Sequence, residues 1–201
     1  LTPSLSEDIR RNVALLKHDL AIINDRFTAS KTVQFRLCGT GVLSRTRALE
    51  LGMVGMVARA SGISIDTRMA RKGVYGAMDL PTSVLEEGDC WARAILRVME
   101  MSASLNWIST ILDRNPEWMP NRIPMGTLRP DSLVVSIVEG WRGEVVHCLE
   151  TGPTGALFHY KVQDPSLRNW MGLALAVRDN DISDFPICNK SFDLSYCGND
   201  L

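Results

Sequence analysis

Cysteine and histidine side chains are the groups in this chain best suited to bind a metal ion or to act as nucleophiles. The cysteines are Cys38, Cys90, Cys148, Cys188 and Cys197, and the histidines are His18, His147 and His159. The cysteines are widely spaced, without a CxxC pair or a cluster with the spacing of a zinc site. No histidine has metal-ligand spacing or a serine or cysteine nucleophile motif beside it. We therefore expect mostly buried thiols in a reducing compartment, no metal ion bound by this chain and no catalytic histidine.

Charged residues between positions 59 and 68 offer a second kind of chemistry. Asp66 and Arg68 lie two residues apart, and a partly buried carboxylate in an ionic network can hold a shifted pKa and handle protons. A solvated surface ion pair is the interpretation that we favour for them. Arg59 either pairs with Asp66 as a structural residue or presents its planar guanidinium group to a carboxylate or a reduced acceptor. The sequence supports both roles for Arg59 equally.

A third group of charges, Glu139, Arg142 and Glu144, lies where a predicted strand meets a bend. Arginine and carboxylate groups form strong bidentate pairs when they meet in a fixed geometry. We predict that these residues fasten a small sheet to a helical core, and we favour this structural role over catalysis.

The composition is that of one globular domain or of a piece of a larger protein. The chain has 201 residues, 45% of them apolar, and its 22 basic and 23 acidic residues give a net charge of -1. No broad electrostatic field draws such a chain to nucleic acid, which is therefore not an expected partner. The longest apolar runs, residues 133–138 and 173–177, are far shorter than the roughly 20 residues of a membrane-spanning helix. The chain begins at Leu1, within sequence that leads directly into a predicted helix, so we expect a longer polypeptide upstream.

Hydrophobic periodicity predicts two long helices. Apolar residues recur at steps of three and four over residues 9–27, after a capping box formed by Ser4 and Glu7. A second helix is predicted to start near Ser83 and to end before Pro116. Each has one apolar stripe, which predicts packing in a bundle.

Shorter segments with strand character predict a small antiparallel sheet in the last third of the chain. The predicted strands are residues 132–139, 144–150 and 156–162, and a short helix is predicted around residues 167–175. The fold class is therefore mainly α, or α+β, with a bundle of long helices and a small sheet. The predicted organisation is a helical core over about residues 1–115, a loop over about residues 116–130, and a hairpin with a terminal segment over about residues 131–201.

Three segments occur in an order that resembles a known family. The first extends from Gly-Thr-Gly at residues 39–41 to Ala-Arg-Ala-Ser-Gly at residues 58–62, with Asp66 and Arg68 following. The second is Asp-Leu-Pro at residues 79–81, with Gly-Asp at residues 88–89 near the start of a long helix. The third begins at residues 138–144, where Trp141 replaces the usual proline, and ends with Ser-Phe-Asp at residues 191–193. Together they resemble the C-terminal half of the NiFe hydrogenase large subunit, especially the energy-converting group 4 type related to formate hydrogenlyase, and the related quinone-site (49 kDa-type) subunit of complex I.

The resemblance also shows a departure from the hydrogenases at the C-terminal metal motif. That motif is Asp-Pro-Cys-x-x-Cys, whose thiolates help to hold nickel and iron, and its Asp aligns with Asp193. Ser195 and Gly198 then stand at the two cysteine positions, and Cys197 lies one residue away from the second. Soft metals prefer a complete thiolate set, so the resemblance implies a nickel site that has been lost. Hydroxyl groups in this vestigial metal site either hydrogen-bond a substrate or, as we favour, fill the emptied volume.

The resemblance implies a function of the complex I type, with Arg59, Ser61, Asp66 and Arg68 as candidates for lining the acceptor cavity. We expect an oxidoreductase subunit, peripheral to the inner, cytoplasmic face of the membrane and inactive as an isolated chain. Five scattered cysteines cannot ligate an iron-sulfur cluster, so electrons would arrive from a cluster in a partner subunit and pass toward a quinone-like acceptor. Membrane-embedded ion-translocating subunits would complete the complex. Two alternatives stay open: a non-catalytic structural or assembly subunit, and a true NiFe hydrogenase with unusual ligands.

Overall fold

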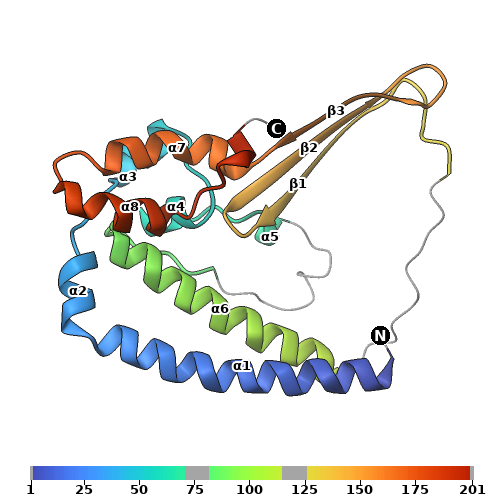
Figure 1. The fold of residues 1–201 in the computed structure, drawn as a ribbon. Coiled ribbons are helices and arrows are strands. Elements are labelled where there is room, and N and C mark those ends of the chain that lie inside the picture. Colours follow the sequence, from blue (N-terminus) through green and yellow to red (C-terminus); the bar gives the residue numbers. More distant parts are fainter. Residues whose placement is uncertain (1, 71–81, 115–125, 200–201) are drawn as a thin grey trace.

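The computed structural model describes residues 2–70, 82–114 and 126–199 and shows helices together with one small sheet (Figure 1). The helices are α1 (Pro3–Ala29), α2 (Lys31–Leu37), α3 (Arg45–Glu50), α4 (Gly55–Ala60), α5 (Thr67–Ala70), α6 (Cys90–Asp113), α7 (Pro165–Ala176), α8 (Phe185–Phe192) and the 3-10 turns η2 (Ile182–Asp184) and η3 (Cys197–Asn199). The strands are β1 (Leu133–Gly140), β2 (Gly143–Thr151) and β3 (Leu157–Gln163). The predicted fold class is confirmed. Residues 79–81 and 116–125, which carry part of the resemblance and most of the predicted loop, lie outside the described residues.

Helices α1 and α6 are the two long helices, and they lie side by side (Figure 1). Val13 of α1 and Leu105 of α6 are buried, and Lys17 donates to the Ser109 hydroxyl across the pair at 2.8 Å. Ile23, a member of the predicted apolar stripe of α1, is nevertheless 58% exposed. Helix α6 therefore covers only part of that stripe.

Helix α1 starts two residues earlier than predicted. The Thr2 hydroxyl accepts a hydrogen bond from the Leu5 N–H at 3.3 Å, and Pro3 occupies the first turn, where no N–H is needed. The capping box predicted for Ser4 and Glu7 is wrong, because Thr2 takes the capping position.

Helix α6 starts later than predicted, because the segment after Ser83 is used elsewhere. Asp89 caps the helix and accepts from the Ala92 N–H at 2.7 Å. Directly before the cap, Gly88 has φ +65°, a conformation that glycine adopts without strain. Its carbonyl accepts from the Leu43 N–H at 2.9 Å, which holds this segment against the extended chain that precedes α3. A helix starting at Ser83 would break these contacts.

The main hydrophobic core lies where the short helices α3, α4, α7 and α8 meet the first turn of α6. Its fully or almost fully buried members are Leu43, Ala48, Met53, Val57, Ala58, Ile63, Cys90, Leu173, Ala176, Cys188, Phe192 and Leu194. The terminal segment of the chain thus returns to the helical core. No helix among the described residues has the length and apolar character needed to span a bilayer.

The three strands form an antiparallel sheet in the order β1-β2-β3, with bounds within one or two residues of the prediction. Figure 1 shows the sheet extending away from the helices, with the β1–β2 turn directed at them. This turn consists of Trp141 and Arg142, between the paired Gly140 and Gly143. The turn therefore places these two side chains at the helical core.

Candidate functional site

A buried cluster of charges joins the sheet to the helices, with Arg59 of α4 at its centre. The guanidinium group donates to Glu100 of α6 and to Glu139 of β1, each at 2.9 Å, and to the Ile65 carbonyl at 3.2 Å. The side chain is only 2% exposed. Arg59 pairs mainly with these two glutamates, since its Nη1 is 3.8 Å from the Asp66 carboxylate. The partner that the sequence suggested is thus the weakest of the three.

Asp66 and Arg68 belong to the same cluster. Arg68 donates to both carboxylate oxygens of Asp66, at 2.9 Å from Nε and 2.5 Å from Nη2. The Asp66 side chain is 2% exposed and that of Arg68 is 15% exposed, so the prediction of a solvated surface pair is wrong. Burial raises the pKa of Asp66, but the hydrogen bonds and charge of Arg68 outweigh it and hold the pKa below its ordinary value.

The cluster has three carboxylates and two guanidinium groups, so it has one excess negative charge when all are ionised. A cavity of about 250 Å³ opens beside it and is lined by Arg68, Glu100, Ser104, Glu139, Gly140 and Trp141. Of the four residues predicted for the acceptor cavity, Arg68 therefore lines this space. Ser61 is fully buried, and its hydroxyl donates to the Leu43 carbonyl at 2.9 Å. Its side chain therefore belongs to the packed interior of the protein.

The three residues predicted to fasten the sheet each pair with a helical part of the protein. Glu139 accepts from Arg59 through one oxygen and from the Thr67 N–H and hydroxyl through the other, at 3.2 and 3.0 Å. Glu144 accepts from Arg168 of α7 at 2.6 Å. Arg142 donates to the Asp193 carbonyl. The predicted bidentate pairing is wrong for the two glutamates, because Arg59 and Arg168 each donate from one nitrogen to one carboxylate oxygen.

Asp193 is the point where the terminal segment meets the hairpin turn. It ends α8 in the left-handed region, with φ 55°. Its carboxylate accepts from Lys190 at 2.9 Å and from the Trp141 indole N–H at 3.1 Å. Burial raises its pKa, but these two hydrogen bonds hold the pKa below the ordinary value. On the other side, Arg97 of α6 donates to the Ser191 carbonyl at 2.7 Å.

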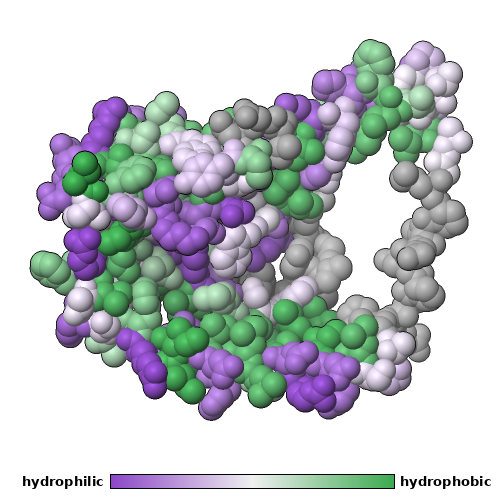
Figure 2. Space-filling view, viewed as in Figure 1, coloured by the Kyte–Doolittle hydropathy of each residue, from purple (hydrophilic) through white to green (hydrophobic). Residues whose placement is uncertain are grey.

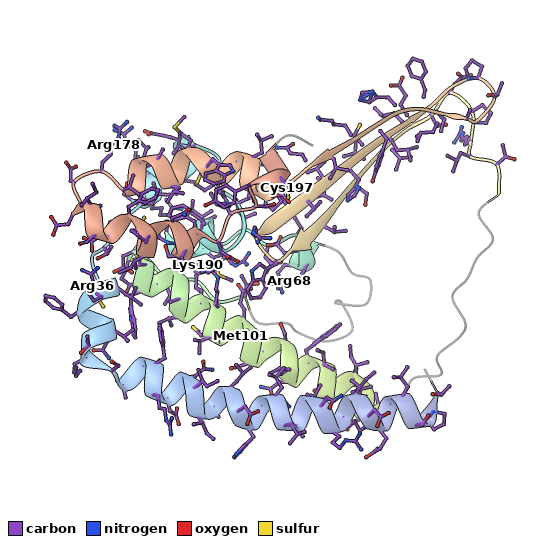
Figure 3. All side chains as sticks on the ribbon, viewed as in Figure 1. Arg36, Arg68, Met101, Arg178, Lys190 and Cys197 are labelled. Carbon is purple, nitrogen blue, oxygen red and sulfur yellow. The ribbon has the colours of Figure 1, made fainter. Side chains whose placement is uncertain are left out.

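The residues that the resemblance places at a vestigial metal site, Ser195, Cys197 and Gly198, contact one another. Ser195 Oγ accepts from the Gly198 N–H at 3.1 Å and lies 3.4 Å from Cys197 Sγ. The Ser195 N–H donates to the Ser166 hydroxyl of α7 at 3.0 Å. The Ser195 hydroxyl thus closes this segment on itself, while Cys197 is exposed; the volume-filling interpretation stays a prediction. Figure 3 labels Cys197 near the C-terminal end of the chain.

A second and larger cavity, of about 630 Å³, lies between α1, α6 and α8 beside Asp193. Its wall is mostly apolar and includes Phe27, Val98 and Ile187, with Arg97 and Lys190 among its charged residues. Figure 3 labels Met101 of α6 and Lys190 of α8, which both line it, and Figure 2 shows apolar side chains remaining at the surface along α1 and α6.

Trp141 lines both cavities, although the sequence marked it only as a departure from a proline. Arg97 and Lys190 were not among the site residues predicted from the sequence. An exposed indole in a two-residue turn was the signal that could have indicated Trp141, because such a ring needs a surface to pack on. Among the described residues, no three histidine, cysteine or acidic side chains come together in a group able to hold a metal ion.

The pKa of Asp66 gives a stability prediction. We expect Asp66→Asn to lower the free energy of unfolding by about 1–3 kcal/mol at pH 7, because Arg68 and Arg59 lose a carboxylate. The folded-state pKa lies below the ordinary value of 3.8, so this stabilisation is complete above that value and disappears as the pH falls through the folded pKa. Urea unfolding of wild type and variant at decreasing pH measures the difference. Asp8→Asn, which removes an exposed partner of Arg11, is the control, and a difference independent of pH would contradict the assignment.

Comparison with known proteins gives a consistent result. Residues 1–125 match the family model described as respiratory-chain NADH dehydrogenase, 49 kDa subunit. The carbon monoxide-induced hydrogenase of Rhodospirillum rubrum is 31% identical over 168 residues, which are 83% of this chain and 46% of that protein. A subunit of the NADH-quinone oxidoreductase of Phocaeicola vulgatus is 33% identical over 165 residues, 81% of this chain and 31% of that protein.

A solved structure has the same fold. A chain of the membrane-bound sulfane sulfur reductase, an archaeal respiratory membrane complex, superposes with a TM-score of 0.90 and 25% identity, covering 99% of this chain and 56% of that one. The chain thus spans between about a third and somewhat over half the length of these three proteins, and it is similar to one part of each.

Proposed function

Because the chain belongs to the family of the 49 kDa subunit of respiratory-chain NADH dehydrogenase, we propose that it forms part of a subunit of a membrane-associated, complex I-like redox complex. Electrons arrive from an iron-sulfur cluster in a partner subunit and pass to a quinone-like acceptor, and this chain does not activate hydrogen. Membrane-embedded ion-translocating subunits and a position at the cytoplasmic face of the membrane belong to the same proposal. Its support is the class of the relatives, which include hydrogenases and NADH-quinone oxidoreductases.

The proposal that this chain does not activate hydrogen rests on the packing at Gly198, which aligns with the second nickel ligand of the hydrogenases. A Cβ atom on Gly198 would lie 2.6 Å from Cγ of Asp164 and 2.9 Å from each of its carboxylate oxygens. Asp164 caps α7 by accepting from the Ser166 N–H at 2.7 Å, so it is held in place. At the first ligand position Ser195 offers a hydroxyl group, a poor ligand for a soft metal. These residues do not fit a nickel-iron centre.

The acceptor is proposed to bind at Trp141, which lies between the two cavities. Its indole provides an apolar face for a planar ring, and the Asp193 carboxylate fixes its orientation. The apolar wall along α1 and α6 suits a hydrocarbon tail, and the neighbouring Arg97 and Lys190 suit carbonyl oxygens that gain negative charge on reduction. Reduction of a quinone to a quinol takes up two electrons, which the partner subunit supplies, and two protons.

The test uses the full-length protein in its native complex, with Trp141→Leu as the variant and Phe158→Leu as the matched control. Phe158 is 75% exposed on β3, away from the hairpin turn. We expect Trp141→Leu to lower the rate of quinone reduction about tenfold or more, because the acceptor loses its positioning surface, and Phe158→Leu to leave the rate unchanged. Nickel content per chain is measured on the same preparations, and a value close to zero is expected.

Two outcomes would overturn the proposal. About one nickel per chain, together with hydrogen-dependent dye reduction, would show that the protein is a true hydrogenase with unusual ligands. Equal rates of quinone reduction for wild type and Trp141→Leu, in complexes that contain every partner in equal amounts, would show that the acceptor does not bind at Trp141.

A structural or assembly subunit is the second candidate, and one observation favours it. Two of the residues expected at the acceptor, Arg59 and Ser61, are buried and hydrogen-bonded to neighbouring groups of the protein. If this candidate holds, loss of the chain will prevent assembly of the complex, whereas substitutions at Trp141 will leave electron transfer in the assembled complex unchanged.

A further inference from the structure

Two buried cysteines from different helices meet beside a buried arginine. Cys90 begins α6 and Cys188 lies in α8, and both side chains are fully buried free thiols. Arg93 Nη2 is 3.4 Å from Cys90 Sγ. A Cβ atom placed on Gly41 would lie 2.5 Å from Cys188 Sγ and 3.1 Å from the same Arg93 nitrogen, which locates both sulfur atoms around one guanidinium group. Both cysteines belong to the same cluster of the hydrophobic core.

The surroundings of Arg93 favour a negative charge on one of these sulfurs. The guanidinium group is fully buried and donates to the carbonyls of Gly41 and Gly88 and to the Ser191 hydroxyl, which are all neutral acceptors. Its carbon lies 4.3 Å from the centre of the Phe192 ring. A buried cation with neutral hydrogen-bond partners is stabilised by a nearby anion, and the Cys90 sulfur is within reach.

The protonation states of the two sulfurs differ accordingly. The hydrogen bond from Cys188 and the charge of Arg93 outweigh burial and lower the pKa of Cys90 to about 6. The same shared hydrogen bond and burial raise the pKa of Cys188. The negative charge is thus favoured on Cys90 and the proton on Cys188, the combination that an attacking and a resolving cysteine require.

We propose that Cys90 and Cys188 form a redox-active dithiol that closes into a disulfide between α6 and α8 when the protein meets hydrogen peroxide. The large cavity beside α8 provides access, since Cys90 lies in its wall and the oxidant is small. The Cys90 thiolate attacks one peroxide oxygen, the O–O bond breaks and, with one proton, water leaves, so that Cys90 becomes a sulfenic acid. The Cys188 sulfur then attacks the Cys90 sulfur, the S–O bond breaks, and the departing hydroxide leaves as a second water with the Cys188 proton. Two thiols and one peroxide thus give one disulfide and two waters.

Closure of the disulfide would change the neighbouring site in two ways. It removes the negative charge that Cys90 presents to Arg93, so that Asp89 remains as the neighbouring anion. It also ties α8 to α6 close to Asp193, the residue that holds Trp141 and Arg142. Oxidation of the pair is therefore a means of altering the hairpin contact without any change in the hairpin itself.

The experiment treats the native complex with increasing hydrogen peroxide, alkylates the remaining free thiols under denaturing conditions and maps peptides without reductant by mass spectrometry. We expect a linked Cys90–Cys188 peptide, two hydrogen atoms lighter than the sum of the two free peptides, which disappears after treatment with dithiothreitol. It should form before oxidation of Cys38, an exposed thiol whose pKa is raised by partial desolvation and by the negative charges of Asp89 and Glu87. Cys148→Ser is the matched control and should leave the linked peptide unchanged.

Two variants assign the roles of the two sulfurs. Cys188→Ser should trap a sulfenic acid at Cys90, detected as a dimedone adduct, whereas Cys90→Ser should give no adduct at Cys188. If peroxide oxidises Cys38 while Cys90 and Cys188 are both recovered as alkylated thiols, the proposal is wrong. This wild-type measurement needs no folded variant and no turnover, so its result is independent of the acceptor proposed above.

Discussion

Replacing Gly55 by alanine is expected to lower the free energy of unfolding by more than about 4 kcal/mol, a loss that few single substitutions reach. Gly55 begins α4 with φ +64°, and a Cβ atom there would lie 2.2 Å from the Arg142 carbonyl oxygen and 2.3 Å from Cα of Gly143. Both contacts are with backbone atoms, which cannot turn aside as a flexible side chain can. The hairpin turn would have to leave the helical core.

Gly52 provides the matched control, because it has almost the same backbone conformation in open space. Its φ is +63° and no atom lies within 4 Å of a Cβ placed there. Gly52→Ala should therefore show only the cost of a left-handed non-glycine residue, about 1–2 kcal/mol. Urea unfolding of both variants, followed by circular dichroism, gives the two values. Equal losses would mean that the close approach of Gly55 to the turn does not contribute, and that the hairpin is held by its ion pairs alone.

The sheet and the position of the long helices could be predicted because their signals are local. Strand character on either side of the turn at residues 152–155 placed the strands within one or two residues of their observed bounds. The start of α6 could not be predicted, since both Ser83 and Asp89 are acceptable N-caps in sequence. Backbone contacts with the chain near Leu43 decide between them, and those contacts join residues far apart in the chain.

The sequence analysis identified residues of the charged cluster but not how they are arranged in space. The burial of Asp66 could not be predicted from its neighbours in sequence, because it depends on Glu100 and Glu139, which reach Arg59 from other elements. The same limit applies to Cys90 and Cys188, which are 98 positions apart in the chain. The expectation of mostly buried thiols is wrong, because only these two of the five cysteines are buried, whereas Cys148 is half-buried and Cys38 and Cys197 are exposed. The loss of the metal site in the terminal segment stays a prediction, which rests on the departure from the hydrogenase motif at Ser195 and Gly198.

Arg59→Met should separate the structural role of Arg59 from a role at the acceptor, which the sequence left evenly balanced. Removing the guanidinium group leaves Glu100 and Glu139 buried without their main partner, and breaking a buried ion pair in this way costs about 3–5 kcal/mol. Arg47→Met is the control: Arg47 pairs with Glu50 on the surface, where the loss should be at most about 1 kcal/mol.

A second substitution tests whether Arg59 stabilises the protein by pairing with buried carboxylates. Glu139→Gln, added to Arg59→Met, removes one of the carboxylates left without a partner, while the amide oxygen still accepts from Thr67. The double variant should therefore recover part of the lost stability in urea unfolding, and quinone reduction in the assembled complex should recover with it. A stable Arg59→Met protein in which only electron transfer is lost would instead place Arg59 at the acceptor. Because all contacts of Arg59 that we describe are with groups of the protein itself, we expect stability and turnover to fall and recover together.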